Sequence, residues 1–228
     1  MVRIEHYTKE RIADPEGDVS IGLLAETLQH LQLEAPYGVF IEEIAKTSRR
    51  MASLVHDLLD FARRRLGTQM PLVRRNCDAG DICAQVVDEV ARVHPGRVIR
   101  LSLAGSTKGN WDPGRLGQLV SNLVGNAICH GADPILVAIA ATDAGIRLDV
   151  ENHGPEIPAS DVADLFEAFR RRPTEGRPAG TGLGLGLYIV REIARAHGGT
   201  VTVSSTPDAT RFTVELPRSP AADDPGRG

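Results

Sequence analysis

Four glycines stand at alternate positions from Gly180 to Gly186 and lead directly into an apolar segment suited to a helix, in the run GTGLGLGLYIV. Glycine loses more backbone freedom on folding than other residues, so this run implies a close backbone approach or positive φ. Two arrangements satisfy this: a tight structural turn, or a loop whose N–H groups meet a phosphate at a helix N-terminus. Glycine-rich loops before helices are common, so the rest of the chain must decide between them.

The first third of the chain has the pattern of a helical hairpin. Residues 37–66 contain no proline, and their apolar positions recur at alternating spacings of three and four. These positions are Ile41, Ile44, Ser48, Met51, Val55, Leu58 and Ala62, with one serine among them. A second stripe spans residues 19–33, and Glu34-Ala35-Pro36 separates the two helices. A lone hairpin buries such stripes poorly, so we predict a four-helix bundle in a homodimer. The alternative is a hairpin packed on its own C-terminal domain.

The remainder has the pattern of a mixed α/β domain. We predict strands at 72–75, 97–103, 135–140 and 145–151, helices at 79–93, 113–130 and 184–197, a turn around Gly109, and a closing hairpin of strands 200–205 and 210–216. The predicted organisation is a divergent N-terminal segment 1–17, a helical hairpin 18–66, an α/β domain 67–217 and a disordered tail 218–228. The fold class is therefore α+β.

Bulk properties exclude several classes of function. A net charge of −4 over 228 residues gives no electrostatic reason to expect nucleic acid as a partner. No apolar run approaches the ~20 residues needed to cross a bilayer, and the N-terminus lacks the apolar block of a secretory signal. We therefore expect no membrane segment in this chain and a cytoplasmic location. The three cysteines have neither the spacing of a metal site nor the even number of a disulfide framework.

Polar residues suited to a nucleotide gather in the α/β domain. Asn122 and Asn126 are four apart, so on a helix they share a face, with His130 one turn further. Asn152 follows a strand and precedes Gly154, where its amide can hydrogen-bond a base edge. Phe166 and Phe169, three apart, precede the loop RRPTEGRPAG and the glycine run. Taken alone, Asn122 and Asn126 are better explained as ordinary exposed or capping residues.

The order and spacing of these four blocks resemble the N, G1, F and G2 boxes of the ATP-binding domain of sensor histidine kinases. The resemblance covers roughly residues 67–217, and VHDLLDFAR at 55–63 looks like the second helix of that family's dimerisation and phosphotransfer hairpin. It implies a two-layer α/β sandwich of the histidine kinase, gyrase and chaperone type, with ATP and Mg²⁺ as cofactors. The ATP-binding positions that it implies are Asn122, Asn126, His130, Asn152, Gly154, Phe166, Phe169, Arg177, Gly182, Leu183, Gly184, Leu185 and Gly186.

Individual roles follow from the same resemblance. Asn126 is implied as the magnesium ligand, with Asn122 beside it; an amide oxygen suits this cation. Asn152 stands where the family usually has an aspartate that reads the adenine amino group. Cys129 replaces a residue that is often basic, and Glu156 replaces the second glycine of G1.

The position of Asn122 also indicates the type of reaction. ATPases of the gyrase, mismatch-repair and chaperone type resemble one another in a glutamate here, as do the anti-sigma-factor serine kinases, and this glutamate is the base that activates water. An asparagine cannot accept that proton. The resemblance therefore favours a site that positions ATP for transfer over one that hydrolyses it.

The phosphoacceptor histidine is the weakest part of the resemblance. The family places a histidine followed by an acidic residue and a proline on the first helix of the hairpin, and neither HExxxP nor HDxxxP occurs here. His6 lies near the expected level, but Asp14-Pro15-Glu16-Gly17 interrupts a helix between it and the hairpin. His30 and His56 fit less well. An acceptor on another chain, a divergent first helix, and no phosphotransfer all remain open.

The function implied is that of a sensor histidine kinase, which transfers the γ-phosphoryl group of Mg·ATP to a histidine. The expected partner is a response-regulator receiver domain, whose aspartate then takes the phosphoryl group. Two alternatives are a nucleotide-binding pseudokinase and a helical interaction protein that binds no ATP.

Overall fold

The computed structural model describes residues 70–170 and 183–218 without interruption. It also describes Ile44, Thr47, Ser48, Met51, Ala52, Leu54, Val55, 57–62 and Arg65, all of them helical. The chain divides into two compact units, Met1–His56 and Asp57–Gly228. The predicted second helix is therefore helical at every described position. The predicted segment 1–17, the first helix of the hairpin and residues 219–228 lie outside the described residues.

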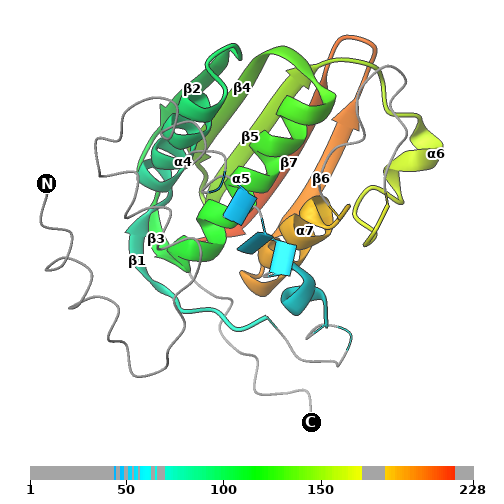
Figure 1. Cartoon of the computed structure of the whole chain (residues 1–228). Helices are drawn as coiled ribbons and strands as arrows, with labels where there is room; N and C mark the ends of the chain where they lie inside the picture. Colours follow the sequence, from blue (N-terminus) through cyan, green and yellow to red (C-terminus); the bar gives the residue numbers. More distant parts are fainter. Residues whose placement is uncertain are drawn as a thin grey trace, which may run out of the picture. The chain divides into compact units, whose positions relative to one another are not determined.

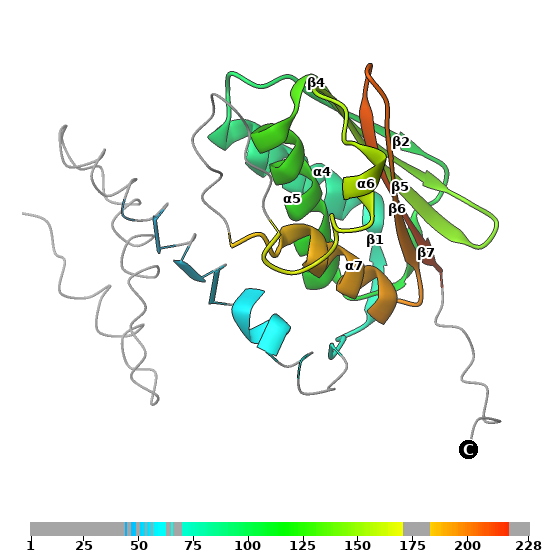
Figure 2. The ribbon, with the colours of Figure 1, turned by 90° about the vertical axis from the view of Figure 1, so that its right-hand side faces the viewer.

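The second unit is built on a five-stranded sheet of order β2-β4-β5-β7-β6. Its strands are β2 (Ile99–Ala104), β4 (Ala132–Ala141), β5 (Gly145–His153), β6 (Thr200–Ser205) and β7 (Thr210–Pro217). Strand β2 pairs with β4 in parallel, and the other neighbours are antiparallel. Three helices cover one face of this sheet, namely α4 (Ala79–Val93), α5 (Pro113–His130) and α7 (Gly186–Ala196) (Figures 1 and 2). This is a two-layer α/β sandwich, as predicted.

The core lies between the sheet and the helices. Alternate residues of β4 and β5 are buried, as period-two side chains on a half-covered sheet require. They are Ile135, Val137, Ile139, Ile146, Leu148 and Val150. Helix α5 is the central helix of the layer and contributes Leu116, Leu119, Val120, Leu123, Val124 and Ala127. Its apolar face is fixed in the core, so its opposite polar face has a fixed position too.

The ends of α5 are as predicted, and the local chemistry explains its start. Pro113 occupies the first turn, where its missing N–H is not needed, and the Asp112 carboxylate accepts a hydrogen bond from the Arg115 N–H at 3.0 Å.

Two predicted elements differ from those observed, and one observed element was not predicted. The predicted strand 72–75 lies three residues further on, as β1 (Arg75–Asp78). The turn predicted around Gly109 is strand β3 (Lys108–Trp111), which pairs with β1. A Cβ on Gly109 would lie 2.3 Å from the Trp111 ring, so this glycine marks a close contact within a strand. The short helix α6 (Ala159–Val162) was not predicted.

A buried histidine joins α7 to the start of α5. The ring of His197 is inaccessible to solvent; its Nδ1 donates to the Ile193 carbonyl at 2.8 Å, and its Nε2 accepts from the Asp112 N–H at 3.1 Å. Burial is the largest cause that lowers the pKa of His197 below 6.5. The folded state therefore favours the neutral ring.

We predict that the unfolding free energy falls as the pH drops below about 6.5, because the unfolded chain then binds a proton that folded His197 resists. Above that pH the contribution is fully present. Urea midpoints between pH 5 and 8 should fall less steeply toward acid in His197→Gln than in the wild type. The matched control is His94→Gln, at an exposed histidine that ends α4, and it should keep the wild-type slope.

Candidate ATP-binding site

The polar face of α5 meets the first turn of α7. A Cβ on Gly186 would lie 3.6 Å from Asn122 Oδ1, so the Asn122 side chain lies against the start of α7. Its Nδ2 is buried and has no hydrogen-bond partner among the described residues. Leu185 precedes α7 and provides no side-chain cap for the N–H groups of its first turn. A buried amide donor and an uncapped helix N-terminus therefore lie together, and both favour an anionic oxygen.

The end of β5 forms a second wall. Asn152 is 6% exposed and lies near the C-terminus of β5. Its Nδ2 donates to the His153 carbonyl at 2.9 Å. Gly154, with φ 148°, lies against the end of α5: a Cβ there would be 3.4 Å from the His130 carbonyl oxygen. The predicted site residues thus lie on two neighbouring segments. Asn122, Asn126 and His130 belong to α5, and Asn152 and Gly154 lie at the end of β5 and directly after it.

Phe169 and Gly184 lie next to each other although they are 15 residues apart in the sequence. The Phe169 N–H donates to the Gly184 carbonyl at 3.0 Å, and both residues have positive φ, 63° and 73°. A Cβ on Gly184 would lie 2.7 Å from the Arg170 carbonyl oxygen. Gly184 therefore needs to be glycine for two reasons, its backbone conformation and the close backbone approach. Of the predicted loop residues, Arg177 and Gly182 lie outside the described residues, as does His6.

We predict that Gly184→Ala weakens Mg·ATP binding by roughly tenfold, because strain of the order of 1 kcal/mol or more would move the segment that leads into α7. Gly198→Ala is the matched control, since Gly198 also has positive φ, 80°, but follows the opposite end of α7, and this variant should keep the wild-type affinity. Titration calorimetry of both variants decides between them. Equal affinities for the two variants would show that Gly184 has no special part in the site.

Three of the four apolar residues of the predicted ATP-binding set, Phe166, Leu183 and Leu185, pack mainly against protein. The Phe166 ring makes a T-shaped contact with Phe212 of β7 at 6.3 Å. Leu185 is buried in the core, and Leu183 is partly buried and packs against the core. These apolar side chains therefore help to hold the backbone of the candidate site in place.

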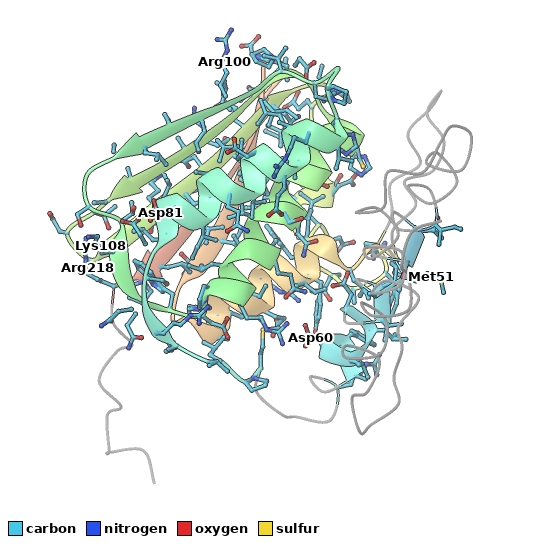
Figure 3. The ribbon with its side chains drawn as sticks, turned by 60° about the vertical axis from the view of Figure 1, so that its left-hand side comes forward. Met51, Asp60, Asp81, Arg100, Lys108 and Arg218 are labelled. Carbon is cyan, nitrogen blue, oxygen red and sulfur yellow. The ribbon has the colours of Figure 1, made fainter. Side chains whose placement is uncertain are left out.

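A polar cluster that the sequence analysis missed joins residues 57–60 to α5. Asp60 accepts hydrogen bonds from Arg115 Nη1 and Nη2 at 2.5 and 3.0 Å. Gln118 accepts from Arg115 at 2.9 Å and donates to Asp57 at 3.2 Å. Asp60 is labelled in Figure 3. Spacing in the sequence places each pair on a single helix face, Asp57 with Asp60 and Arg115 with Gln118, but does not show that the two faces meet.

An aromatic contact lies beside this cluster. Phe61 makes T-shaped contacts with Phe169 at 4.8 Å and with Tyr188 at 5.7 Å. Residues 57–61 thus contact the first turn of α5, the start of the loop at Phe169 and the first turn of α7. Phe169 and the first turn of α7 border the candidate site, and α5 carries its asparagines.

Comparison with known proteins agrees with this geometry. Residues 111–220 match the family described as histidine kinase-, DNA gyrase B-, and HSP90-like ATPase. The chain is 32% identical over 178 residues to a bacteriophytochrome of Pseudomonas aeruginosa, covering 77% of this chain and 24% of that protein. It is 35% identical over 181 residues to the probable sensor histidine kinase TcrY of Mycobacterium tuberculosis, covering 78% of this chain and 38% of that protein. The chain thus spans well under half the length of these relatives.

Solved structures give the same result. The structure of full-length ShkA in complex with AMPPNP superposes with a TM-score of 0.65 at 29% identity, covering 89% of this chain and 43% of that one. The histidine kinase AdeS of Acinetobacter baumannii has a TM-score of 0.63 at 21% identity, over 93% and 98% of the two chains, and shows the shared fold.

Residues 111–220 therefore belong to the histidine kinase-, DNA gyrase B-, and HSP90-like ATPase family. The predicted ATP-binding core of a sensor histidine kinase is confirmed. No helix among the described residues is both long and apolar enough to span a membrane.

Proposed function

We propose that this chain binds Mg·ATP between α5 and α7 and transfers the γ-phosphoryl group to a histidine, from which a response-regulator aspartate receives it. The observation that carries the proposal is the buried Nδ2 of Asn122, which has no hydrogen-bond partner among the described residues and lies beside the uncapped start of α7. An unpartnered buried donor costs free energy, which a bound phosphate oxygen would offset. Curated relatives named as sensor histidine kinases support the type of reaction.

The residues present fit a magnesium ion. Asn126 lies one helical turn after Asn122 on α5, and its amide oxygen is the type of ligand that Mg²⁺ accepts together with phosphates and water. When bound, the ion neutralises charge on the phosphates. The chain itself supplies position: α5 holds the asparagines, α7 directs N–H groups at the phosphates, and Asn152 reads the base. Phosphoryl transfer depends chiefly on such positioning and charge stabilisation.

The same arrangement favours transfer over hydrolysis. Asn122 stands where the hydrolytic relatives of this fold have a basic glutamate, and an amide cannot take a proton from water. A neutral imidazole brought to the γ-phosphate attacks with a nitrogen lone pair and needs no base, so it is then a better acceptor than water. ATP and the response regulator place the proposed reaction in the cytoplasm.

The helix before the sandwich supports a homodimer as part of the proposal. Four of its predicted seam positions, Ile44, Met51, Val55 and Leu58, are exposed in the single chain. Exposed apolar residues at alternating spacings of three and four suit a bundle with a second copy. The acceptor histidine stays a prediction, because His6, His30 and His56 all lie outside the described residues.

The experiment is incubation of the purified chain with γ-labelled ATP and Mg²⁺. We expect label that is acid-labile, base-stable and dependent on Mg²⁺, and peptide mapping to place it on a histidine. The chain should be tested alone and with a second, catalytically inactive copy that retains its histidines. Retained ATP binding without label in either setting would favour the nucleotide-binding module without phosphotransfer.

A further inference from the structure

Arg97 lies in the loop between α4 and β2 and reaches the end of α5. Its Nη2 donates to the carbonyl oxygens of Gly131 and Ala127, at 3.1 and 3.5 Å. Its Nε lies 3.1 Å from Asp133 Oδ1. The Ala127 carbonyl also accepts from the Gly131 N–H at 2.8 Å, and a guanidinium suits the carbonyls at a helix C-terminus in both geometry and charge. Arg97 therefore fixes the point at which α5 ends.

Gly131 in turn lies directly against Asn152. A Cβ on Gly131 would be 2.3 Å from Asn152 Nδ2 and 2.4 Å from its Cγ, so only a bare backbone fits there. The other side of the amide is also fixed, because Nδ2 donates to the His153 carbonyl at 2.9 Å. The contacts hold the amide in one orientation. Oδ1 is then the atom of Asn152 that accepts a hydrogen bond from a ligand.

We propose that Arg97 is a positioning residue for recognition of the base, acting through Gly131 on Asn152. The inference rests on the proposed function, in which Asn152 reads the base. With the amide held, Oδ1 accepts from the exocyclic amino group of adenine. Hypoxanthine has a keto oxygen there, so two acceptors would face each other. Arg97 thus contributes to the choice of adenine without contacting it.

The test compares the affinities of ATP and inosine triphosphate, each with Mg²⁺, for the full chain. The wild type should bind ATP roughly tenfold or more tightly, because a mismatched buried polar group is strongly disfavoured. In Arg97→Met, the ratio should fall to within about threefold of unity while the affinity for inosine triphosphate changes little, since the phosphate contacts remain. Asp133→Asn is the matched control: it removes the ion pair and keeps both carbonyl contacts, so its ratio should equal that of the wild type.

The ratio of the affinities for ATP and inosine triphosphate distinguishes a positioning role of Arg97 from a purely structural one. If Arg97→Met weakens the binding of both nucleotides equally and keeps this ratio, Arg97 only stabilises the fold and the inference is overturned. Gly131→Ala tests the same contact if the methionine variant does not fold, because the added Cβ must displace the Asn152 amide. An unchanged ratio in this variant also overturns the inference. If the wild type binds no ATP, the proposed function itself is contradicted. This outcome differs from failure of the Arg97 inference alone, in which the wild type still binds ATP.

Discussion

Replacing Asn126 with alanine is expected to lower the initial rate of γ-phosphoryl labelling by about 100-fold or more, as loss of one preorganised electrostatic contact in an active site typically does. Asn126 is the proposed Mg²⁺ ligand, and alanine removes its amide oxygen from the metal. The rate should be measured at saturating ATP and Mg²⁺.

Two further variants make the result specific to the metal. Ser121→Ala changes an exposed residue of the same helix and should label at the wild-type rate. Asn126→Asp keeps an oxygen ligand and should retain more activity than alanine, with an altered dependence on the Mg²⁺ concentration. A loss of less than about threefold in Asn126→Ala would remove Asn126 from the metal site.

Replacing Arg115 with methionine is expected to lower the free energy of unfolding by ~3–5 kcal/mol, because it leaves the Asp60 carboxylate buried without its partner. The Asp60 and Arg115 side chains are only 3% and 12% exposed, and the guanidinium binds both carboxylate oxygens. Urea unfolding followed by circular dichroism measures the loss. The pair also joins residues 57–60 to the helix that carries the asparagines, so ATP affinity should fall in the same variant.

The control for Arg115 is Arg147→Met, which breaks the ion pair with Asp149 on the open face of the sheet. Arg147 is 44% exposed, and we expect a change below about 1 kcal/mol. The double variant Asp60→Leu with Arg115→Met should recover most of the stability lost in Arg115→Met, since neither charge then remains buried. If it recovers none, the loss comes from packing of the Arg115 side chain.

The elements that the sequence predicts well are those with a strong local signal. Helix α5 has a proline at its start, an aspartate cap and an unbroken apolar face, and its predicted bounds match those observed. Strands β6 and β7 likewise agree, to within one residue at one end. By contrast, Gly109 suggests a turn, because nothing local indicates that the Trp111 ring packs over it.

The candidate site is predictable from the sequence only where a local signal exists. Helical spacing alone places Asn122 and Asn126 on one face of α5, whereas the contact of Asn122 with the start of α7 depends on tertiary packing. Within the glycine run, Gly184 needs its positive φ and its close backbone approach, whereas a Cβ on Gly186 would make only ordinary contact with Asn122. The contacts of Arg97 with Gly131 and of Arg115 with Asp60 span 34 and 55 residues, beyond the reach of any local pattern.

The most direct test of the account is calorimetric titration of the full chain with AMPPNP in the presence and absence of Mg²⁺. We expect one nucleotide per chain, binding that weakens at least tenfold when Mg²⁺ is removed, and loss of that dependence in Asn126→Ala. No binding, or binding of equal strength with and without Mg²⁺, would contradict a Mg·ATP site between α5 and α7.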